Sequence, residues 1–301
     1  MLKRVLLFVV TNLLVTLAIS FILSLLGLGG YRIRGGIDYG SLAVMCLIWG
    51  SVGSFISLAI SRWSAKRMMG VKLVDGRTGH DDADWLYRTV QRLTTQAQLP
   101  MPEVGIYESP EVNAFATGPS ASRSLVAVSS GLLRGMQRDE VEGVLAHEVS
   151  HIKNGDMVTM ALIQGVVNAF VMFGSVVVAN IIRNALRGNR DGRDDGGGGG
   201  YMMEFMIRMV LQVVFGLLGS MVVAWFSRAR EFRADAGAAA LSGRGNMIAA
   251  LHRLQGTHQL VDAREPALAT MKIAGGDGKW MMLLSTHPPL EERIAALEHL
   301  R

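Results

Sequence analysis

The sequence of 301 residues predicts a mainly α-helical, polytopic membrane protein with four transmembrane helices and a small soluble α+β part. Hydrophobic residues make up 50% of the chain, and the mean hydropathy is +0.31. A helix needs roughly 20 apolar residues to cross a bilayer. Four runs without any charged residue meet or approach this length, with 27, 21, 26 and 19 residues: 5–31, 41–61, 157–182 and 209–227.

The first run follows Lys3 and Arg4 and contains the small residues Ala18 and Ser20, so a cleaved signal peptide is the alternative interpretation. The apolar part of a signal peptide is 7–15 residues long, whereas this run continues unbroken to Leu28. We therefore expect a retained transmembrane helix. The fourth run is the shortest and contains Gln212, which makes it the weakest of the four.

The net charge of +5 and the pI near 9.6 raise the question of a nucleic-acid partner. The basic residues, however, lie next to the apolar runs, as in membrane proteins, and no basic stripe with interleaved aromatic residues occurs. We therefore expect the lipid bilayer, with its anionic headgroups, as a partner and no nucleic acid. The basic clusters lie at 3–4, 62–67, 183–193 and 228–233.

Local patterns outside the runs predict the soluble elements. Residues 81–99 have apolar side chains at helical spacing, and 103–107 alternate like a strand. Two more strands, 111–117 and 124–129, are predicted to form a hairpin. Towards the C-terminus we expect a helix at 246–254, a mobile loop at 256–284, where periodic signals are few, and a helix at 290–300 that begins after prolines.

The expected organisation has four parts. Residues 1–61 hold the first two transmembrane helices, and 62–156 form a soluble α+β part that ends with a histidine-bearing helix. Residues 157–227 form a transmembrane hairpin whose glycine-rich tip, 188–200, is predicted to be a flexible linker. Residues 228–301 form a soluble helical part.

The sequence Val-Leu-Ala-His-Glu-Val-Ser-His at 144–151 predicts a metal site. His147 and His151 lie one helical turn apart, so both rings can bind one ion. Glu148 can instead reach a water molecule there and act as general base. The alternative, two solvated histidines on a surface helix, is disfavoured by the apolar residues around them, which indicate a buried face.

A catalytic zinc ion usually has three protein ligands, so a third is required. Glu231 is the candidate, on a helix-forming stretch where Asp235 follows one turn later. Asp235 can accept a hydrogen bond from a ligating imidazole and fix its tautomer. The alternative is a solvated helix on which these acids pair with neighbouring arginines.

The two halves of this site must lie on one side of the bilayer, so the chain between them crosses an even number of times. The third and fourth runs satisfy this condition as a hairpin. Lysines and arginines favour one side by ten to six, which predicts that both termini and the active site are cytoplasmic.

Four blocks, 112–118, 146–156, 227–235 and 286–289 with Arg293, resemble the HtpX-type membrane metallopeptidases, which are relatives of the CAAX prenyl endopeptidases. The resemblance implies a gluzincin-like HExxH metallopeptidase core and one zinc ion per chain. It places His147, His151 and Glu231 on that ion, with Glu148 as base and Asp235 beside the ligands. It also implies a stress-response endopeptidase of the bacterial inner membrane, acting in quality control on misfolded membrane proteins or unfolded polypeptides.

The resemblance further places Asn113 on a substrate-binding strand edge, where its alternative role is to cap or turn that strand. His287 and Arg293 carry donors that could stabilise an oxyanion, a role that the resemblance favours. The residues alone would favour His287 as a helix cap. A metal transporter or metal-dependent scaffold is the competing function, but the four runs lack the charged residues of an ion path. The oligomeric state stays open.

Overall fold

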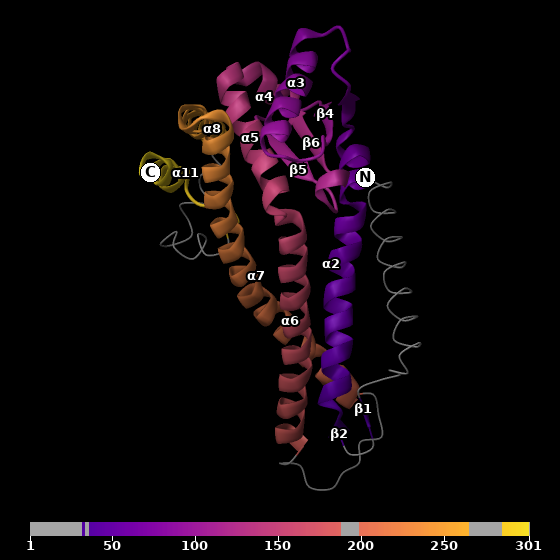
Figure 1. Cartoon of the computed structure of the whole chain (residues 1–301). Coiled ribbons are helices and arrows are strands. Elements are labelled where there is room, and N and C mark those ends of the chain that lie inside the picture. The colour runs from indigo at the N-terminus through magenta and orange to yellow at the C-terminus, as the bar shows by residue number, and fades with distance from the viewer. Residues whose placement is uncertain (1–31, 34–35, 188–198, 265–284, 301) are drawn as a thin grey trace. The chain divides into compact units, whose positions relative to one another are not determined.

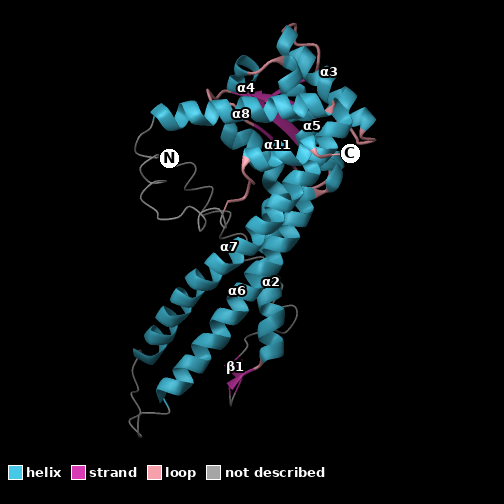
Figure 2. Ribbon diagram, turned by 90° about the vertical axis from the view of Figure 1, so that its left-hand side faces the viewer, coloured by secondary structure: helices cyan, strands magenta, loops and turns pink. Residues whose placement is uncertain are grey.

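The computed structural model describes residues 32–33, 36–187, 199–264 and 285–300 (Figure 1). Most of these residues are helical, as the ribbon in Figure 2 shows, and a four-stranded sheet accompanies them. The chain divides into two compact units, residues 1–57 with 161–223 and residues 58–160 with 224–301. The prediction of a mainly helical protein with a small sheet is confirmed.

The first unit contains the apolar lengths of three helices, α2 (Tyr39–Met69), α6 (Asp156–Arg187) and α7 (Gly199–Ser242). Within the described residues, three segments are long and apolar enough to cross a membrane: Tyr39–Met69, Asp156–Leu186 and Met202–Ser242. They contain the second, third and fourth predicted runs. The first predicted run, 5–31, lies outside the described residues.

Helices α2 and α6 approach each other closely in this unit. A Cβ atom added at Gly50 would lie 2.6 Å from the carbonyl oxygen of Gly165, so only glycine permits this contact. Apolar side chains such as Phe170 and Val213 are exposed on the outer faces of α6 and α7. Exposed apolar faces on long helices are expected where lipid, not water, surrounds the protein.

The sheet of the second unit has the strand order β3-β4-β6-β5. Strand β4 (Glu103–Tyr107) pairs in parallel with β6 (Leu125–Ser129), while β3 (Lys72–Val74) and β5 (Ala114–Thr117) pair antiparallel with their neighbours. The predicted hairpin is confirmed, because β5 and β6 pair antiparallel. Strand β5 is an edge of the sheet.

Gly118 makes the turn after β5 possible. Its φ is +144°, and an added Cβ atom would lie 2.2 Å from the carbonyl oxygen of Arg123.

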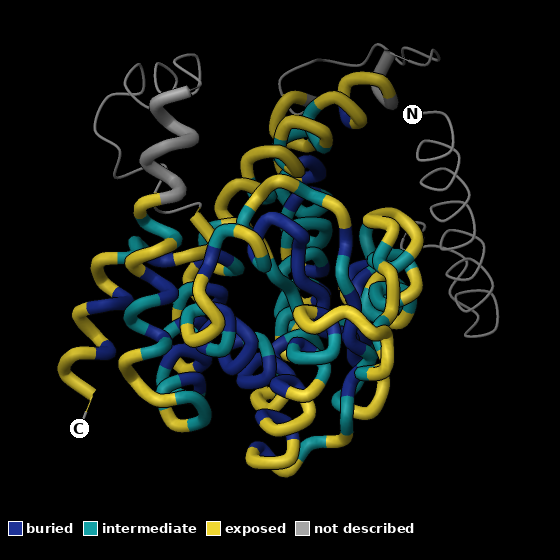
Figure 3. Tube along the Cα trace, turned by 90° about the horizontal axis from the view of Figure 1, so that it is seen from above, coloured by how far each residue is buried: buried dark blue, intermediate teal, exposed yellow. Residues whose placement is uncertain are grey.

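Buried apolar side chains from β4, β6, α3 (Asp81–Gln96), α5 (Arg138–Asn154) and α8 (Arg244–Arg264) form one core. Figure 3 colours the buried stretches of the chain dark blue. On strand β4, Val104 points into this core, while Tyr107 belongs to a separate apolar cluster that includes Ala65 of α2. The remaining elements are β1 (Arg32–Ile33), β2 (Gly36–Ile37), η1 (Ala121–Arg123), α4 (Ser130–Gly135) and α11 (Leu290–Glu298).

Two helices extend beyond their expected bounds. Helix α7 begins at Gly199 and so includes the last two residues of the stretch expected to be a flexible tip, while the rest of that stretch, 188–198, lies outside the described residues. Helix α8 continues to Arg264 instead of ending at Leu254, so the loop expected from Gly256 does not begin there. A single glycine such as Gly256 costs a helix only about 1 kcal/mol relative to alanine, which neighbouring helix formers can offset. The remainder of the expected loop, 265–284, lies outside the described residues.

Candidate metal centre

Helix α5 presents both histidines of the predicted site. Its start is fixed by a capping box in which Glu140 accepts a hydrogen bond from the backbone N–H of Gln137 at 2.7 Å. Its end is fixed by Gly155, which has the left-handed conformation at φ 66°. His147 and His151 are buried between these ends, and their Nε2 atoms lie 3.0 Å apart.

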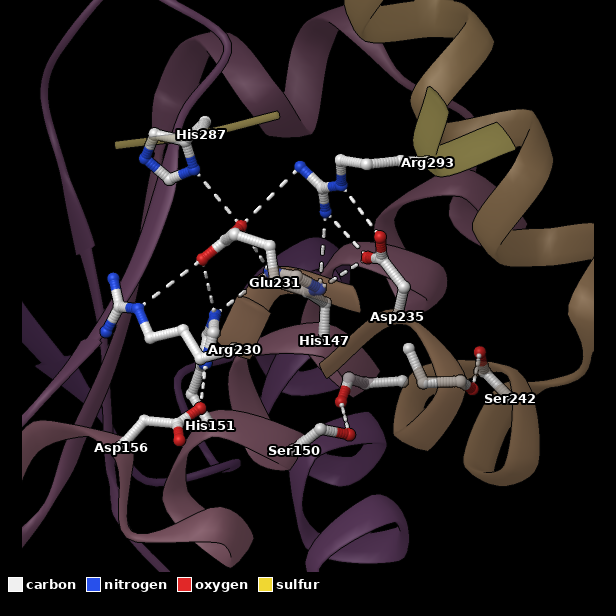
Figure 4. A network of polar contacts seen from close by, with 12 residues as sticks. His147, Ser150, His151, Asp156, Arg230, Glu231, Asp235, Ser242, His287 and Arg293 are labelled. Carbon is white, nitrogen blue, oxygen red and sulfur yellow. Dashed lines mark hydrogen bonds and ion pairs between the residues drawn. The ribbon is translucent and has the colours of Figure 1, made fainter. Parts of the chain in front are cut away.

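Glu231 of α7 completes the group, as predicted for the third ligand. Its carboxylate oxygens lie 3.5 Å from Nε2 of His147 and 3.4 Å from Nε2 of His151. Figure 4 shows the carboxylate pointing at both rings. The three ligand atoms lie within 4.8 Å of one another, so one ion can contact all of them.

A carboxylate holds the far nitrogen of each ring. Nδ1 of His147 lies 2.9 Å from Oδ1 of Asp235, and Nδ1 of His151 lies 2.6 Å from Oδ2 of Asp156. Because a carboxylate only accepts, each Nδ1 donates, which leaves a lone pair on each Nε2 of the neutral rings. This is the tautomer that a metal ligand requires.

The group of acceptors fits a bound cation. Glu231 is 1% exposed, and its Oε1 atom forms no hydrogen bond of ordinary geometry among the described residues, although Nε2 of His151 lies at 3.4 Å and Nε of Arg230 at 3.7 Å. Two imidazole lone pairs and a buried carboxylate repel one another unless a positive charge lies between them. The donor set of two nitrogen atoms and one oxygen atom matches catalytic zinc sites, which keep a fourth position open.

The pKa values of the two rings reflect the same electrostatics. Burial lowers the pKa of His151, but the hydrogen bond to Asp156 and the nearby carboxylate of Glu231 outweigh burial and raise it to about 9. For His147, burial again lowers the pKa, while bonds to Asp235 and Glu231 raise it above its ordinary value. The site therefore attracts positive charge. One divalent ion meets this demand better than protons on nitrogen atoms 3.0 Å apart.

Arg293 of α11 is buried behind the ligands. Its Nε and Nη2 atoms donate to the two oxygens of Asp235 at 2.7 and 2.6 Å. Its Nη1 atom lies 3.6 Å from Oε2 of Glu231. Burial lowers the pKa of Arg293, yet the bonds to Asp235 outweigh burial, so the guanidinium keeps its charge. Asp235 is thus held on both sides, by Arg293 and by His147.

His287 lies on the open side of the site. Its Nδ1 atom is 3.1 Å from Oε2 of Glu231, and its side chain is 63% exposed. The segment that carries it is fixed to α7, because Arg228 donates to the carbonyl oxygen of Ser285 at 2.8 Å. The structure therefore brings both His287 and Arg293 beside the predicted third ligand.

Helices α5 and α7 approach closely enough to bring these ligands together because of a glycine. A Cβ atom added at Gly237 would lie 2.6 Å from Oγ of Ser150. Ser150 itself is buried, and its hydroxyl donates to the carbonyl oxygen of Ala146 at 2.7 Å. A larger residue at position 237 would push α7 away from α5.

The remaining two predicted residues are Glu148 and Asn113, of which Glu148 is adjacent to a ligand and Asn113 makes its hydrogen bonds within the sheet. Glu148 follows His147 on α5 and is partly exposed, and its charge contributes to the raised pKa values of His147 and His151. Asn113 is exposed and precedes edge strand β5. Its backbone exchanges hydrogen bonds with Ser129, whose Oγ accepts from its N–H at 3.1 Å.

Sequence reasoning missed the role of Asp156. This residue begins α6 directly after Gly155, and it is 1% exposed. An aspartate at the boundary between a histidine-bearing helix and an apolar run is the sequence signal that could have identified it, because an acid beside a membrane-spanning run requires a partner.

The comparisons with known proteins agree with this geometry. The profile of peptidase family M48 matches residues 80–301. The chain is 51% identical over 300 residues to protease HtpX of Shewanella oneidensis, covering 98% of this chain and 99% of that protein. It is 47% identical over 304 residues to a protease HtpX homolog of Methylacidiphilum infernorum, covering 100% and 99%.

The crystal structure of Ste24p from S. mikatae has a similar fold, with a TM-score of 0.58 at 18% identity. The match covers 85% of this chain and 58% of that chain. The matched family profile includes both histidines, Glu231 and the C-terminal segment. The chain belongs to peptidase family M48 and is a membrane metallopeptidase.

Proposed function

We propose that the protein is a zinc-dependent endopeptidase that hydrolyses peptide bonds of membrane proteins, misfolded ones above all, in membrane protein quality control. The observation that carries this proposal is the convergence of His147, His151 and Glu231, whose ligand atoms lie within 4.8 Å. Partners on the far side of each imidazole support a metal role over a purely structural ion-pair cluster.

His147, His151 and Glu231 would hold the ion. When bound, zinc supplies a Lewis acid that polarises the peptide carbonyl and makes water acidic enough to ionise near neutral pH. Glu148 accepts the proton of the attacking water at its carboxylate and delivers it to the leaving amine. Asp235 and Asp156 keep the two rings in the tautomer that binds metal.

We assign the stabilisation of the oxyanion to His287 and Arg293. The exposed ring of His287 can turn towards a substrate while its neighbours stay fixed. Arg293 is bound to Asp235, so its contribution is the field of its positive charge beside Glu231. Removing one oxyanion donor from another hydrolase costs about 2.7–4 kcal/mol.

Strand β5 is the proposed substrate-binding edge. An extended peptide can add to such an edge through main-chain hydrogen bonds. Asn113, exposed at the start of β5, would then contact the substrate. This arrangement is supported by the edge position of β5 and by its place beside α5.

We further propose that the protein lies in the bacterial inner membrane, with both termini and the metal site in the cytoplasm. The excess of Lys and Arg on that side supports this orientation. A reporter fused to the C-terminus should be active only inside the cell. Activity only outside would overturn the orientation but not the chemistry.

The direct test combines metal analysis with proteolysis. The purified full chain should contain one zinc ion and cleave casein or a model membrane substrate, and a chelator should abolish cleavage. A folded sample without such an ion, or with an ion enclosed by four side chains, would contradict the proposal.

A further inference from the structure

The metal ligands lie close to the ends of the apolar runs, and this spacing restricts what the site can reach. On α7 the uncharged run ends at Ser227, and Glu231 follows four residues later on the same helix. At a rise of 1.5 Å per residue, the third ligand lies at most about 6 Å along the helix beyond that run.

The aromatic residues at this end of the run mark a membrane interface. Trp225 is 59% exposed and packs against Phe226 with ring centroids 4.7 Å apart. Tryptophan is enriched at the boundary between hydrocarbon and water. Arg228 and Arg230 follow at once, as expected for the headgroup region.

The junction between α5 and α6 independently places the metal ligands close to the end of an apolar run. Asp156 directly precedes the apolar run 157–182, and its Oδ2 atom lies 2.6 Å from Nδ1 of His151. One hydrogen bond therefore joins a proposed metal ligand to the residue directly before an apolar run. Two helices that are distant in sequence place the ligands beside their own apolar boundaries.

Helix α2 extends this relationship to the sheet. Its apolar run ends at Ser61, and Arg62 and Lys66 form ion pairs with Glu103 at 3.5 and 2.9 Å. Glu103 begins β4 and is in register with Leu125 of β6, which in turn pairs with Thr117 at the end of β5. Thr117, at the end of edge strand β5, is therefore in register with Glu103, the residue that forms ion pairs with α2.

We infer that the preferred substrates are cleaved in extended segments adjacent to a transmembrane span, on the order of 3–10 residues from its end, given about 3.3–3.6 Å per extended residue. This inference rests on the proposed peptidase function and adds the position of the cut. A chain leaving the bilayer meets the metal ligands within the first few residues. Distant parts of a soluble domain do not.

The test uses the full chain, loaded with zinc and reconstituted in phospholipid vesicles. The substrate has one transmembrane span followed by about 40 residues of a uniform flexible repeat, so that sequence preference cannot bias the position of the cuts. Mass spectrometry of the products should find the cuts concentrated in the first ten residues or so. Cuts that also appear when the Glu148→Gln variant replaces the wild type are made by a contaminant.

A matched pair of spacers sharpens the test. Ten residues of rigid helix inserted after the span move the flexible repeat about 15 Å away from the membrane, whereas ten flexible residues leave a cleavable segment at the surface. We expect the rigid spacer to lower the cleavage rate at least about tenfold relative to the flexible one.

The outcomes separate the two proposals. Cuts spread evenly along the repeat, or equal rates with both spacers, would overturn the inference and leave the peptidase function standing. No cleavage of any substrate, including the repeat released from its span, would overturn the proposed function and the inference with it.

Discussion

Nδ1 of His151 donates a hydrogen bond to Oδ2 of Asp156 over 2.6 Å, and this bond joins a metal ligand to the first residue of an apolar helix. Gly155 lies directly before this residue, and its left-handed conformation ends α5 there. The orientation of His151 therefore depends on the junction between α5 and α6.

Replacing Asp156 should weaken zinc binding without removing a ligand. Asp156→Asn loses the charge that favours donation from Nδ1, and we expect a 10–100-fold loss of zinc affinity. Competition with a chromogenic chelator measures this affinity. Asp139→Asn, an exposed substitution on the same stretch of chain, is the control and should bind zinc like the wild type. Equal affinities for both variants would contradict the assigned role.

Replacing the proposed base should separate catalysis from metal binding. Glu148→Gln cannot accept a proton, so we expect the cleavage rate to fall about 10²–10⁴-fold while zinc content stays at the wild-type level. Glu142→Gln on the same helix is a matched control, since Glu142 is paired with Arg92 at 2.7 Å outside the site. Wild-type cleavage by the Glu148 variant would rule out the mechanism.

Removing the third ligand should remove the stabilisation that zinc provides. In the wild type at 100 times the dissociation constant, zinc contributes about 2.7 kcal/mol to the free energy of unfolding. A chelator should therefore lower the melting temperature of the wild type. Glu231→Gln should melt at one temperature with or without chelator, and a zinc-dependent shift in this variant would show that Glu231 is not a ligand.

Zinc binding at pH 7 should release protons. In the metal-free site the raised pKa of His151, about 9, keeps this ring protonated at neutral pH, whereas the ligand must be neutral. Calorimetric titrations in two buffers of different ionisation enthalpy should give a release of about one proton or more per zinc, decreasing above pH 9. Buffer-independent heats at pH 7 would contradict this expectation.

The same pKa fixes how the metal-free protein responds to pH. A raised folded-state pKa stabilises the fold fully below the unfolded value of 6.5, and this stabilisation is lost as the pH rises through about 9. The melting temperature of the zinc-free protein should therefore decrease as the pH rises from 6.5 through about 9, and a constant melting temperature over that interval would contradict the expectation.

The contact between α5 and α7 should tolerate no methyl group at position 237. Gly237→Ala should cost about 1–3 kcal/mol through overpacking against Ser150. Gly216→Ala on the same helix has open space around it and should not destabilise the protein in a thermal melt. Adding Ser150→Gly to Gly237→Ala should give a smaller loss than the sum of the two single variants, and strict additivity would argue against the contact.

The ligands were predictable because their signal is local. His147 and His151 follow helical spacing, and Glu231 was the candidate third ligand because it lies on a helix-forming stretch with a second acid, Asp235, one turn later. The pairing of Arg293 with Asp235 was not predictable, since the two are 58 residues apart and no periodic pattern connects them.

The end of a helix was predictable where the sequence contains a helix-stopping residue such as glycine. It was not predictable where the sequence only changes from apolar to charged residues. Gly155 ends α5, because a left-handed residue stops a helix, and glycine at such a position is readable in the sequence. The charge that begins at Arg228 ends an apolar run but not a helix, so α7 continues for 44 residues from Gly199 to Ser242. A change in hydropathy shows where a helix leaves the membrane, but it does not show where the helix ends.

The long α7 helix also has a consequence for biosynthesis. Glu231 lies 80 residues after His151, beyond two apolar runs, so a nascent chain has no complete donor set until the hairpin has been made. We therefore expect the growing polypeptide to lack the proposed metal site, and with it hydrolytic activity, until the last apolar helix has been translated.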